Sequence, residues 1–510
     1  MVNKKIFLCV VLLLLVSGMN MISGGTSSSE FKNEVTRGFE DFEMDMNISE
    51  VSLASFIGES LEDLSGRSVS GAGDVNGDGY HDFLIGAPFN DEGGSYAGQT
   101  YLIFGKATGW SMDMDLSNAD ASFIGEVEND GSPRDVSGAG DVNGDGYDDF
   151  LIGSWANDEG GGGAGQTYLI LGRSKGWSMD VDLSAVDASF IGEDARDSSG
   201  DFVSGAGDVN GDGYDDILIG AMNNDEGGTD AGQTYLILGR SKGWKMDMDL
   251  SSADASFIGE AAGDTLSTVS GAGDVNGDGY DDILIGAFRN SDGGSEAGKT
   301  YLFLGRSTGW TMDMDSSSAD ASFIGEAADD WSALVSEAGD INGDEYDDFL
   351  IGSCKNDEGG LGSGQAYIVL GKPTGWRADV NLSTVDASII GSGQSISGAG
   401  DVNGDGFDDI LIPGNGVNLF LGRSTGWSMD MNHSSADASF RGENKYDLFG
   451  WSVSGAGDVN GDGCEDILIG ASQNDEGGNS AGQTYLISPH GASEPLEIYD
   501  ISITGELGED

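Results

Sequence analysis

"DVNGDGYDD", residues 141–149, is one of seven near-copies of a nine-residue acidic stretch in this chain. The copies begin 57 to 67 residues apart, at Asp74, Asp141, Asp208, Asp274, Asp340, Asp401 and Asp458. A repeat of this length indicates a solenoid, a propeller or an array of similar units. The fold is therefore best predicted from the repeating unit rather than from single segments.

Each unit contains four segments that are typical of short β-strands, separated by turn-forming residues. In the unit that begins at Asp187 they read "DASFIG", "VSGAGD", "DILIGA" and "GQTYLILG". "DILIGA" is a continuous apolar run, as expected for a strand that is buried on both faces. Four antiparallel strands in each of seven units predict an all-β fold, a seven-bladed β-propeller of four-stranded blades.

The two ends of the repeat region predict how the ring closes. The last unit ends at "GQTYLIS" (residues 482–488) without a following "SFIGE", whereas an extra copy of "SFIGE" lies at residues 55–59. We expect this N-terminal strand to complete the last blade, a permutation that an open solenoid does not need. The predicted organisation is a signal peptide at 1–25, a linker at 26–41, the propeller at 42–488 and an acidic tail at 489–510.

Composition and charge restrict the location and the partners. The chain has 510 residues with a formal net charge of −67, and such a surface repels nucleic acid and anionic lipid. Lys4 and Lys5 before the apolar run 6–16 are typical of a secretory signal peptide, with an uncleaved membrane anchor as the alternative. We expect a monomeric propeller, secreted or at the cell surface, with no membrane insertion after signal cleavage.

The acidic stretch is predicted to bind calcium. Side chains at positions 1, 3, 5 and 9 and the carbonyl at position 7 offer oxygen ligands, and Ca²⁺ takes about six to eight oxygens. The side chain at position 7 is expected to be free to vary, and glycine at position 6 fits a positive φ. The fifth copy departs there with Glu345, which makes it the doubtful site among up to seven. The alternative is an acidic turn without an ion, although its carboxylates then repel one another. The predicted ligands are Asp74, Asn76, Asp78, Tyr80 and Asp82; Asp141, Asn143, Asp145, Tyr147 and Asp149; Asp208, Asn210, Asp212, Tyr214 and Asp216; Asp274, Asn276, Asp278, Tyr280 and Asp282; Asp340, Asn342, Asp344, Tyr346 and Asp348; Asp401, Asn403, Asp405, Phe407 and Asp409; and Asp458, Asn460, Asp462, Cys464 and Asp466.

The stretch "FGWSVSGAGDVNGDG" from Phe449, continuing to "DILIGA", resembles the FG-GAP repeat, the blade unit of the integrin alpha-subunit head. The resemblance covers roughly residues 42–488. It implies calcium in the acidic loops and an extracellular ligand-binding propeller. Only the last unit has a clear "FG", and the full "GAP" occurs only at residues 86–88. The resemblance does not extend to a stalk or a membrane span, so integrin-type signalling is not implied.

The loops of the predicted blades divide between two faces. The acidic loops share one face with the third turns, such as "RSKGWSMDVDLS" (residues 173–184), while the second turns share the other face with the connections after "SFIGE". Cys354 and Cys464 fall on opposite faces by this rule and cannot pair. The connections after "SFIGE" vary from unit to unit, and variable loops on a rigid scaffold commonly carry binding. The alternative is unselected variation. The candidate ligand-face residues are Arg67, Arg134, Arg196, Trp331, Tyr446 and Trp451.

The expected function is a calcium-binding adhesion or binding module with an extracellular protein or glycan ligand. A carbohydrate-binding propeller is the alternative, and an extracellular polysaccharide-processing enzyme is a further one. No nucleophile elbow, zinc pair or phosphate loop is present, so we expect no enzymatic activity. The recurring "GW" tryptophans suggest packing between blades more strongly than sugar stacking. They are Trp110, Trp177, Trp244, Trp310, Trp376 and Trp427.

Overall fold

The computed structural model describes residues 45–360, 362–391, 393 and 395–488. These residues lie within one compact unit. The predicted signal peptide, the linker and the acidic tail lie outside the described residues.

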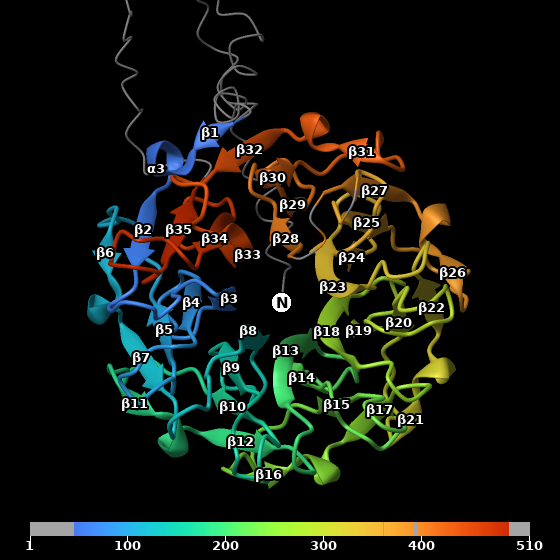
Figure 1. The fold of residues 1–510 in the computed structure, drawn as a ribbon, viewed down its shortest axis with the longest axis horizontal. Coiled ribbons are helices and arrows are strands. Elements are labelled where there is room, and N and C mark those ends of the chain that lie inside the picture. The colour runs from blue at the N-terminus through green and yellow to red at the C-terminus, as the bar shows by residue number, and fades with distance from the viewer. Residues whose placement is uncertain (1–44, 361, 392, 394, 489–510) are drawn as a thin grey trace, which may run out of the picture. The chain divides into compact units, whose positions relative to one another are not determined.

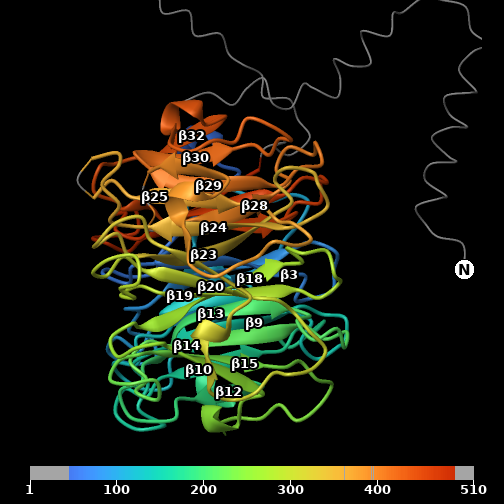
Figure 2. The same ribbon diagram turned by 90° about the vertical axis from the view of Figure 1, so that its right-hand side faces the viewer.

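Seven β-sheets surround a central axis, so the predicted seven-bladed propeller is confirmed (Figure 1). Seen from the side, loops project from both faces of the ring (Figure 2). The first strand of every blade lies next to the axis. In blade order these inner strands are β3 (Ser68–Gly73), β8 (Asp135–Gly140), β13 (Ser199–Gly207), β18 (Leu266–Gly273), β23 (Ser332–Gly339), β28 (Ser397–Gly400) and β33 (Phe449–Gly457).

Three further strands follow in each blade, and each pairs antiparallel with the strand before it. The second strands are β4 (Asp82–Ala87), β9 (Asp149–Ser154), β14 (Asp216–Ala221), β19 (Asp282–Ala287), β24 (Asp348–Ser353), β29 (Asp409–Gly414) and β34 (Asp466–Ala471). The third strands are β5 (Gln99–Ile103), β10 (Gln166–Ile170), β15 (Gln233–Ile237), β20 (Lys299–Phe303), β25 (Gln365–Val369), β30 (Gly416–Phe420) and β35 (Gln483–Ile487). The fourth strands are β7 (Ala121–Ile124), β12 (Ala188–Ile191), β17 (Ala255–Ile258), β22 (Ala321–Ile324), β27 (Ala387–Ile390), β32 (Ala438–Arg441) and, for the last blade, β2 (Ala54–Ile57).

The prediction of four strands per blade is wrong by one, because each sheet has a fifth, two-residue strand that runs parallel to the fourth. It comes from the third turn of the following blade, and it covers a sheet edge that would otherwise expose unpaired backbone groups. These strands are β11 (Val181–Asp182), β16 (Met248–Asp249), β21 (Met314–Asp315), β26 (Val380–Asn381), β31 (Met431–Asn432), β1 (Met46–Asn47) and β6 (Met114–Asp115). Each is followed by one short helical turn: η2 (Leu183–Ala185), η3 (Leu250–Ser252), η4 (Ser316–Ser318), η5 (Leu382–Thr384), η6 (His433–Ser435), α3 (Ile48–Val51) and η1 (Leu116–Asn118).

The N-terminal segment of the described chain lies beside the C-terminal strands. β2 pairs antiparallel with β35, so Phe56 is opposite Thr484, and β1 pairs parallel with β32. Residues 46–57 therefore occupy the places in the last blade that a third turn and a fourth strand occupy in the other blades.

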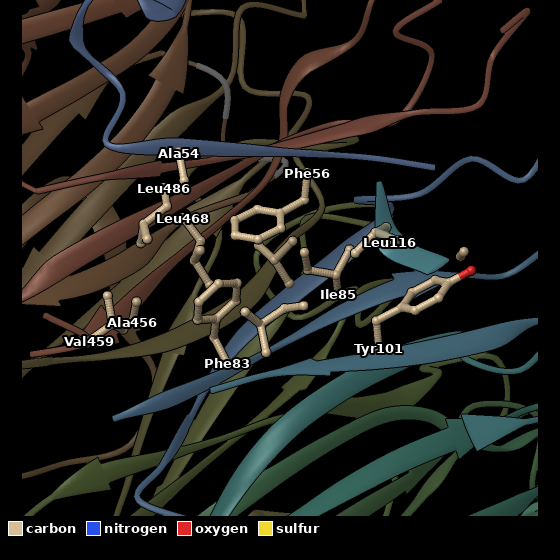
Figure 3. Packing of buried hydrophobic residues seen from close by; sticks show 13 residues of the cluster. Ala54, Phe56, Phe83, Ile85, Tyr101, Leu116, Ala456, Val459, Leu468 and Leu486 are labelled. Atoms are coloured by element: carbon tan, nitrogen blue, oxygen red, sulfur yellow. The ribbon is translucent and has the colours of Figure 1, made fainter. Parts of the chain in front are cut away.

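The hydrophobic core lies between neighbouring blades rather than within one blade. Between the last blade and the first, Phe56 and Leu486 meet Phe83, Ile85 and Tyr101, all of them buried (Figure 3). The second strands are buried along their whole length, except at Gly414 at the end of β29, which explains their continuous apolar sequence. Each Å² of apolar surface buried here contributes about 25 cal/mol to stability. Because this surface lies between blades, its burial stabilises the ring as a whole.

The "GW" tryptophans pack against these inter-blade cores, as predicted. Trp110 contacts the cluster between the last and first blades, with its ring centroid 6.3 Å from that of Phe56 and 6.3 Å from that of Phe83. Its indole N–H donates to the carbonyl of Lys106 at 2.9 Å, and the Lys106 ammonium lies over the ring. The polar edge of Trp110 is therefore already hydrogen-bonded within the protein, and the residue has a structural role.

The assignment of loops to two faces also agrees with the structure. Asn129, in a connection after "SFIGE", donates its backbone N–H to Ser95 of a second turn. Gly172, at the start of a third turn, donates to Asp149 of an acidic loop. Cys354 and Cys464 are both free thiols. No helix in the described part of the chain is long and apolar enough to cross a membrane.

Candidate functional site

The acidic loops adopt one shared conformation, for which residues 141–149 serve as the example. The carboxylate of Asp141 accepts from the backbone N–H groups of Gly144 (2.7 Å), Asp145 (3.0 Å) and Gly146 (2.8 Å). The carboxylate of Asp145 accepts from the N–H of Tyr147 at 3.2 Å. The loop is thus a tight turn with its acidic side chains directed toward its own backbone.

The aspartate at position 9 is the most buried acid of the loop. Asp149 has no exposed surface, and it accepts from the N–H groups of Gly172 (2.7 Å) and Val142 (3.1 Å) and from the amide of Asn143 (3.2 Å). Burial, with a further contribution from the charges of Asp141 and Asp145, raises the pKa of Asp149 to about 8. The same burial raises the pKa of the matching aspartates in the other six loops to about 7 or about 8.

The donor set of the loops fits a hard cation such as calcium, because it contains only oxygen ligands of carboxylate, amide and carbonyl type. No lysine or arginine forms an ion pair with these aspartates within the described chain. In that part of the chain no three His, Cys, Asp or Glu side chains are gathered in a way that could hold a metal ion. The carboxylates accept backbone N–H groups instead of converging, so a cation would require them to turn toward one another.

Position 6 of the loop requires a positive φ, as predicted. Gly146 has φ of +91°, and in the fifth loop Glu345 adopts +73°. The N–H of Glu345 still donates to Asp340 at 2.8 Å, as the N–H of Gly146 does to Asp141. The fifth loop therefore keeps the shared conformation, with a non-glycine residue in a left-handed region that is unfavourable for it.

The side chain at position 7 is not free to vary, in contrast to the prediction. Tyr214 packs on Gly144 of the preceding blade's loop, where an added Cβ would lie 2.5 Å from the ring carbon Cε1 of the tyrosine. The other loops repeat this contact, with Phe407 on Gly343 and Cys464 on Gly404. The aromatic residues at this position are explained by packing between blades, which a pattern within one unit does not reveal.

Position 8, which the sequence analysis did not single out, also joins neighbouring loops. The carboxylate of Asp215 accepts from the N–H of Asp141 at 2.8 Å, and Asp148 accepts from Asp74 in the same way at 2.7 Å. Glu465 and His81 occupy this position in the last and first loops, where the N–H of His81 donates to Asp458. The signal available in the sequence was an acid at position 8 in every copy except the first.

A cavity opens on the opposite face, over blades 1 to 3. It has a volume of about 560 Å³, and Arg67 and Arg134 are in its lining. Trp451 lies beside Arg67, whose guanidinium carbon is 4.0 Å from the indole centroid. Arg134 is paired with buried Asp201 at 2.6 Å. The structure therefore brings together three of the six residues predicted for the ligand face.

The other three predicted residues lie apart from this cavity. Arg196 is exposed in the connection before β13, and Tyr446 is exposed in the connection before β33. The indole N–H of Trp331 donates to Glu296 at 3.1 Å, and the ammonium of Lys355 lies 2.9 Å from the centroid of the Trp331 ring. These residues share the face but do not form one site.

The sequence analysis missed three aromatic residues of the cavity. Phe89, Tyr96 and Trp155 are 41%, 47% and 42% exposed, which is unusual for side chains of this size. All three lie in the second turns, which the sequence analysis placed on this face without naming a candidate ligand residue in them. For Phe89 and Tyr96 the signal available was an aromatic residue at turn positions that other units fill with small or polar residues. Trp155 carried no such signal, because its position holds Met222 and Phe288 in the next two units.

The central axis holds a second hollow of about 440 Å³, lined mainly by Ser, Gly and Ala of the inner strands. Asp215, Asp281 and Asp347, from position 8 of three loops, also line it. Glu337 replaces the glycine of the other blades, and its exposed side chain adds a carboxylate to the lining of this hollow. The hollow is narrow, polar and acidic, in contrast to the aromatic cavity on the other face.

Comparison with known proteins agrees with the geometry. The FG-GAP repeat family matches residues 65–103, 133–170, 200–237, 267–303 and 449–487, which cover the first four blades and the last. The chain is 29% identical over 237 residues to integrin alpha pat-2 of Caenorhabditis briggsae, covering 41% of this chain and 17% of that protein. It is also 29% identical over 212 residues to integrin alpha-V of Gallus gallus, covering 39% of this chain and 19% of that protein.

A further relative is not an integrin subunit but is named as an enzyme. The chain is 23% identical over 371 residues to a phosphatidylinositol-glycan-specific phospholipase D of Dictyostelium discoideum, covering 71% of this chain and 32% of that protein. The chain thus spans less than a third of the length of each of these relatives. Its described part is a seven-bladed propeller in which five blades match the FG-GAP repeat, and the chain is similar to integrin alpha subunits.

Proposed function

We propose that the protein is a secreted or cell-surface binding module, with its ligand site on the face opposite the acidic loops. The observation that carries the proposal is the difference between the two faces. The acidic loops are near-copies and contain no lysine or arginine, whereas the opposite face varies and holds a cavity with arginine and aromatic side chains. The similarity to integrin alpha subunits supports a binding or adhesion role.

The test is binding of the purified, calcium-loaded protein to panels of extracellular proteins and glycans. Substitutions on the proposed ligand face, such as Trp155→Ala, are expected to abolish binding of any ligand found. Substitution of an exposed third-turn residue on the acidic-loop face, such as Lys175→Ala, tests whether the two faces differ. If only the third-turn variant loses binding, the assignment of the ligand face is wrong.

We also propose that the acidic loops hold calcium as a structural ion. In the loop of residues 141–149, Asp141, Asn143, Asp145 and Asp149 would supply side-chain oxygens, and Tyr147 its carbonyl. A bound cation would offset the repulsion between the three carboxylates and favour the charged form of buried Asp149. Its contribution here is electrostatic, and the loops join the first two strands of each blade, so calcium would stabilise the ring.

Calcium titration by calorimetry, together with thermal unfolding in calcium, magnesium or chelator, tests this proposal. Chelation is expected to lower the melting temperature, and magnesium to substitute poorly because it demands smaller octahedral sites. Asp145→Ala should remove one site from the stoichiometry, whereas Glu159→Ala, an exposed acid of a second turn, should remove none. Identical melting curves in all three conditions would show that the loops are turns without a structural ion.

We propose that binding, rather than catalysis, is the activity of this propeller. The similarity to a phospholipase D makes hydrolysis of phosphodiester substrates one relevant measurement, and the alternative of a polysaccharide-processing enzyme makes hydrolysis of glycosidic substrates the other. Turnover of either class by the purified chain, lost on substitution of a cavity residue, would overturn the proposal.

A further inference from the structure

We propose that the cavity over blades 1 to 3 binds an acidic saccharide, with the carboxylate of a uronic acid residue on Arg67 and its pyranose ring against Tyr96 or Trp155. This inference rests on the proposed ligand face and names the chemical class of the ligand. It follows from the charge, the shape and the side-chain chemistry of the cavity.

The charge of the cavity favours an anion. Arg134 is already neutralised by Asp201, at 2.6 Å. Arg67 has no acidic partner within the described residues, and its guanidinium is half-buried against Trp451. Burial and the nearby charge of Arg134 lower the pKa of Arg67, so a neighbouring anion would relieve an unfavourable environment. Arg67, Arg196, Arg289 and Arg377 are the described arginines without an ion pair, and of these four Arg67 alone lines the cavity.

The guanidinium of Arg67 is also positioned for recognition. The contact with Trp451 restricts the side chain, and a planar guanidinium can bind both oxygens of a carboxylate. A lysine could supply the charge but not this bidentate geometry. The arginine is therefore partly held in place before any ligand binds.

The walls of the cavity fit a sugar ring. Phe89 and Tyr96 contact each other edge to face, with centroids 5.5 Å apart, and Trp155 comes from the neighbouring blade. The C–H faces of a pyranose pack on flat, exposed aromatic rings, while its hydroxyl groups need polar partners. Asn129 and Asn223 line the same cavity and offer amide groups for those hydroxyls. A volume of about 560 Å³ lies within the range of small-ligand sites.

An acidic peptide is the less favoured occupant. Extended peptides are commonly bound by adding a strand to a free sheet edge. The outer edges of the first two blades are already covered, by β11 on β7 and by β16 on β12. The cavity offers side chains instead of a free strand, which suits a compact ring with one charged substituent.

The experiment is a titration of the full, calcium-loaded protein with three probes, followed by NMR and calorimetry. The probes are trigalacturonate, the uncharged maltotriose and a short glutamate-containing peptide. Trigalacturonate is expected to bind at least about tenfold more tightly than either of the others, because a charge-assisted bidentate contact is lost with them. Tighter binding of maltotriose or of the peptide would overturn the inference.

Variants locate the binding. Arg67→Gln should weaken trigalacturonate binding about tenfold or more, and Arg67→Lys should restore only part of it. Trp155→Ala removes part of the proposed stacking surface at a residue that is exposed, so it tests stacking without altering the fully buried core. Arg289→Gln is the matched control, because Arg289 also lies near an indole on this face, 6.0 Å from the centroid of Trp331, but outside the cavity. Thermal unfolding of each variant verifies that it is folded.

The outcomes separate this inference from the proposed function. If trigalacturonate does not bind but another ligand found in the panels is lost in Arg67→Gln, the ligand face stands and the acidic saccharide is wrong. If trigalacturonate binds equally to wild type and Arg67→Gln, the site is wrong. If substitutions on this face change the binding of none of the ligands, the proposed function is wrong as well.

Discussion

Two glycines of one acidic loop allow the packing between blades to be measured separately from backbone strain. Gly144 and Gly146 both have positive φ, +74° and +91°, and both donate their N–H to the carboxylate of Asp141. A Cβ at position 144 would lie 2.5 Å from Cε1 of Tyr214 in the next blade, whereas a Cβ at position 146 would meet nothing within 4 Å. Alanine at either position keeps the N–H and adds the same strain.

We expect Gly146→Ala to lower the free energy of unfolding by about 1–2 kcal/mol, the cost of a left-handed conformation for a residue with a Cβ. Gly144→Ala carries the same cost and adds overpacking against Tyr214, which is typically about 1–3 kcal/mol. Its total is therefore about 2–5 kcal/mol. The difference between the two variants measures the contact between neighbouring blades.

The assay is urea unfolding of both variants in excess calcium, with the same comparison repeated in a Tyr214→Ala background. Removing the ring should reduce the cost of Gly144→Ala to that of Gly146→Ala, because the double-mutant cycle removes the contact itself. Equal costs of the two substitutions in the wild-type background would refute the argument, since Tyr214 would then move aside freely.

Three further changes test other features of the ring. Glu345→Gly should raise the melting temperature of the protein in calcium, because it removes a non-glycine residue at φ of +73°; a lower value would show that the Glu345 carboxylate contributes to the fifth loop. Lys299 is 5% exposed, pairs with Glu260, Asp292 and Asp379, and occupies a place that is glutamine in most blades. Lys299→Met should lower the free energy of unfolding, measured in urea, by about 1–3 kcal/mol, and Lys299→Gln should lower it by less. The reverse order would contradict the role of Lys299 as the partner of these acids. Burial raises the pKa of Glu126 to about 7, so the folded protein holds a proton there that the unfolded chain releases near the ordinary value of 4.5; stability from this group is present at low pH and is lost as pH rises toward 7. Glu126→Gln should therefore raise the melting temperature at pH 8 relative to wild type but not at pH 4.5, and an equal effect at both would exclude the titration.

The sequence was sufficient to predict the number of blades, their four main strands and the face on which each loop lies. The reason is that these features recur within every unit, so seven copies report the same alternation of apolar and turn-forming residues. The positive φ at position 6 and the packing role of the tryptophans were predictable for the same reason. The positive φ depends on the backbone of a single unit, and the tryptophan recurs at the same position of the unit.

Contacts between units were decided by the tertiary structure. The fifth strand of each blade is only two residues long, and it pairs with the preceding unit, so no periodicity in the sequence marks it. The same holds for Tyr214 on Gly144 and for Asp215 on Asp141, in which the partners are about one repeat apart.

The ligand cavity also depends on the tertiary structure, because its residues come from several blades rather than from two neighbouring ones. Arg67 and Trp451 are far apart in the sequence and meet only because the ring brings the last blade against the first. Trp155 reaches the same cavity from the second blade. A repeat determines its own strands through local hydrophobic patterning, whereas a site built from several blades exists only once the closed ring sets the distances between them.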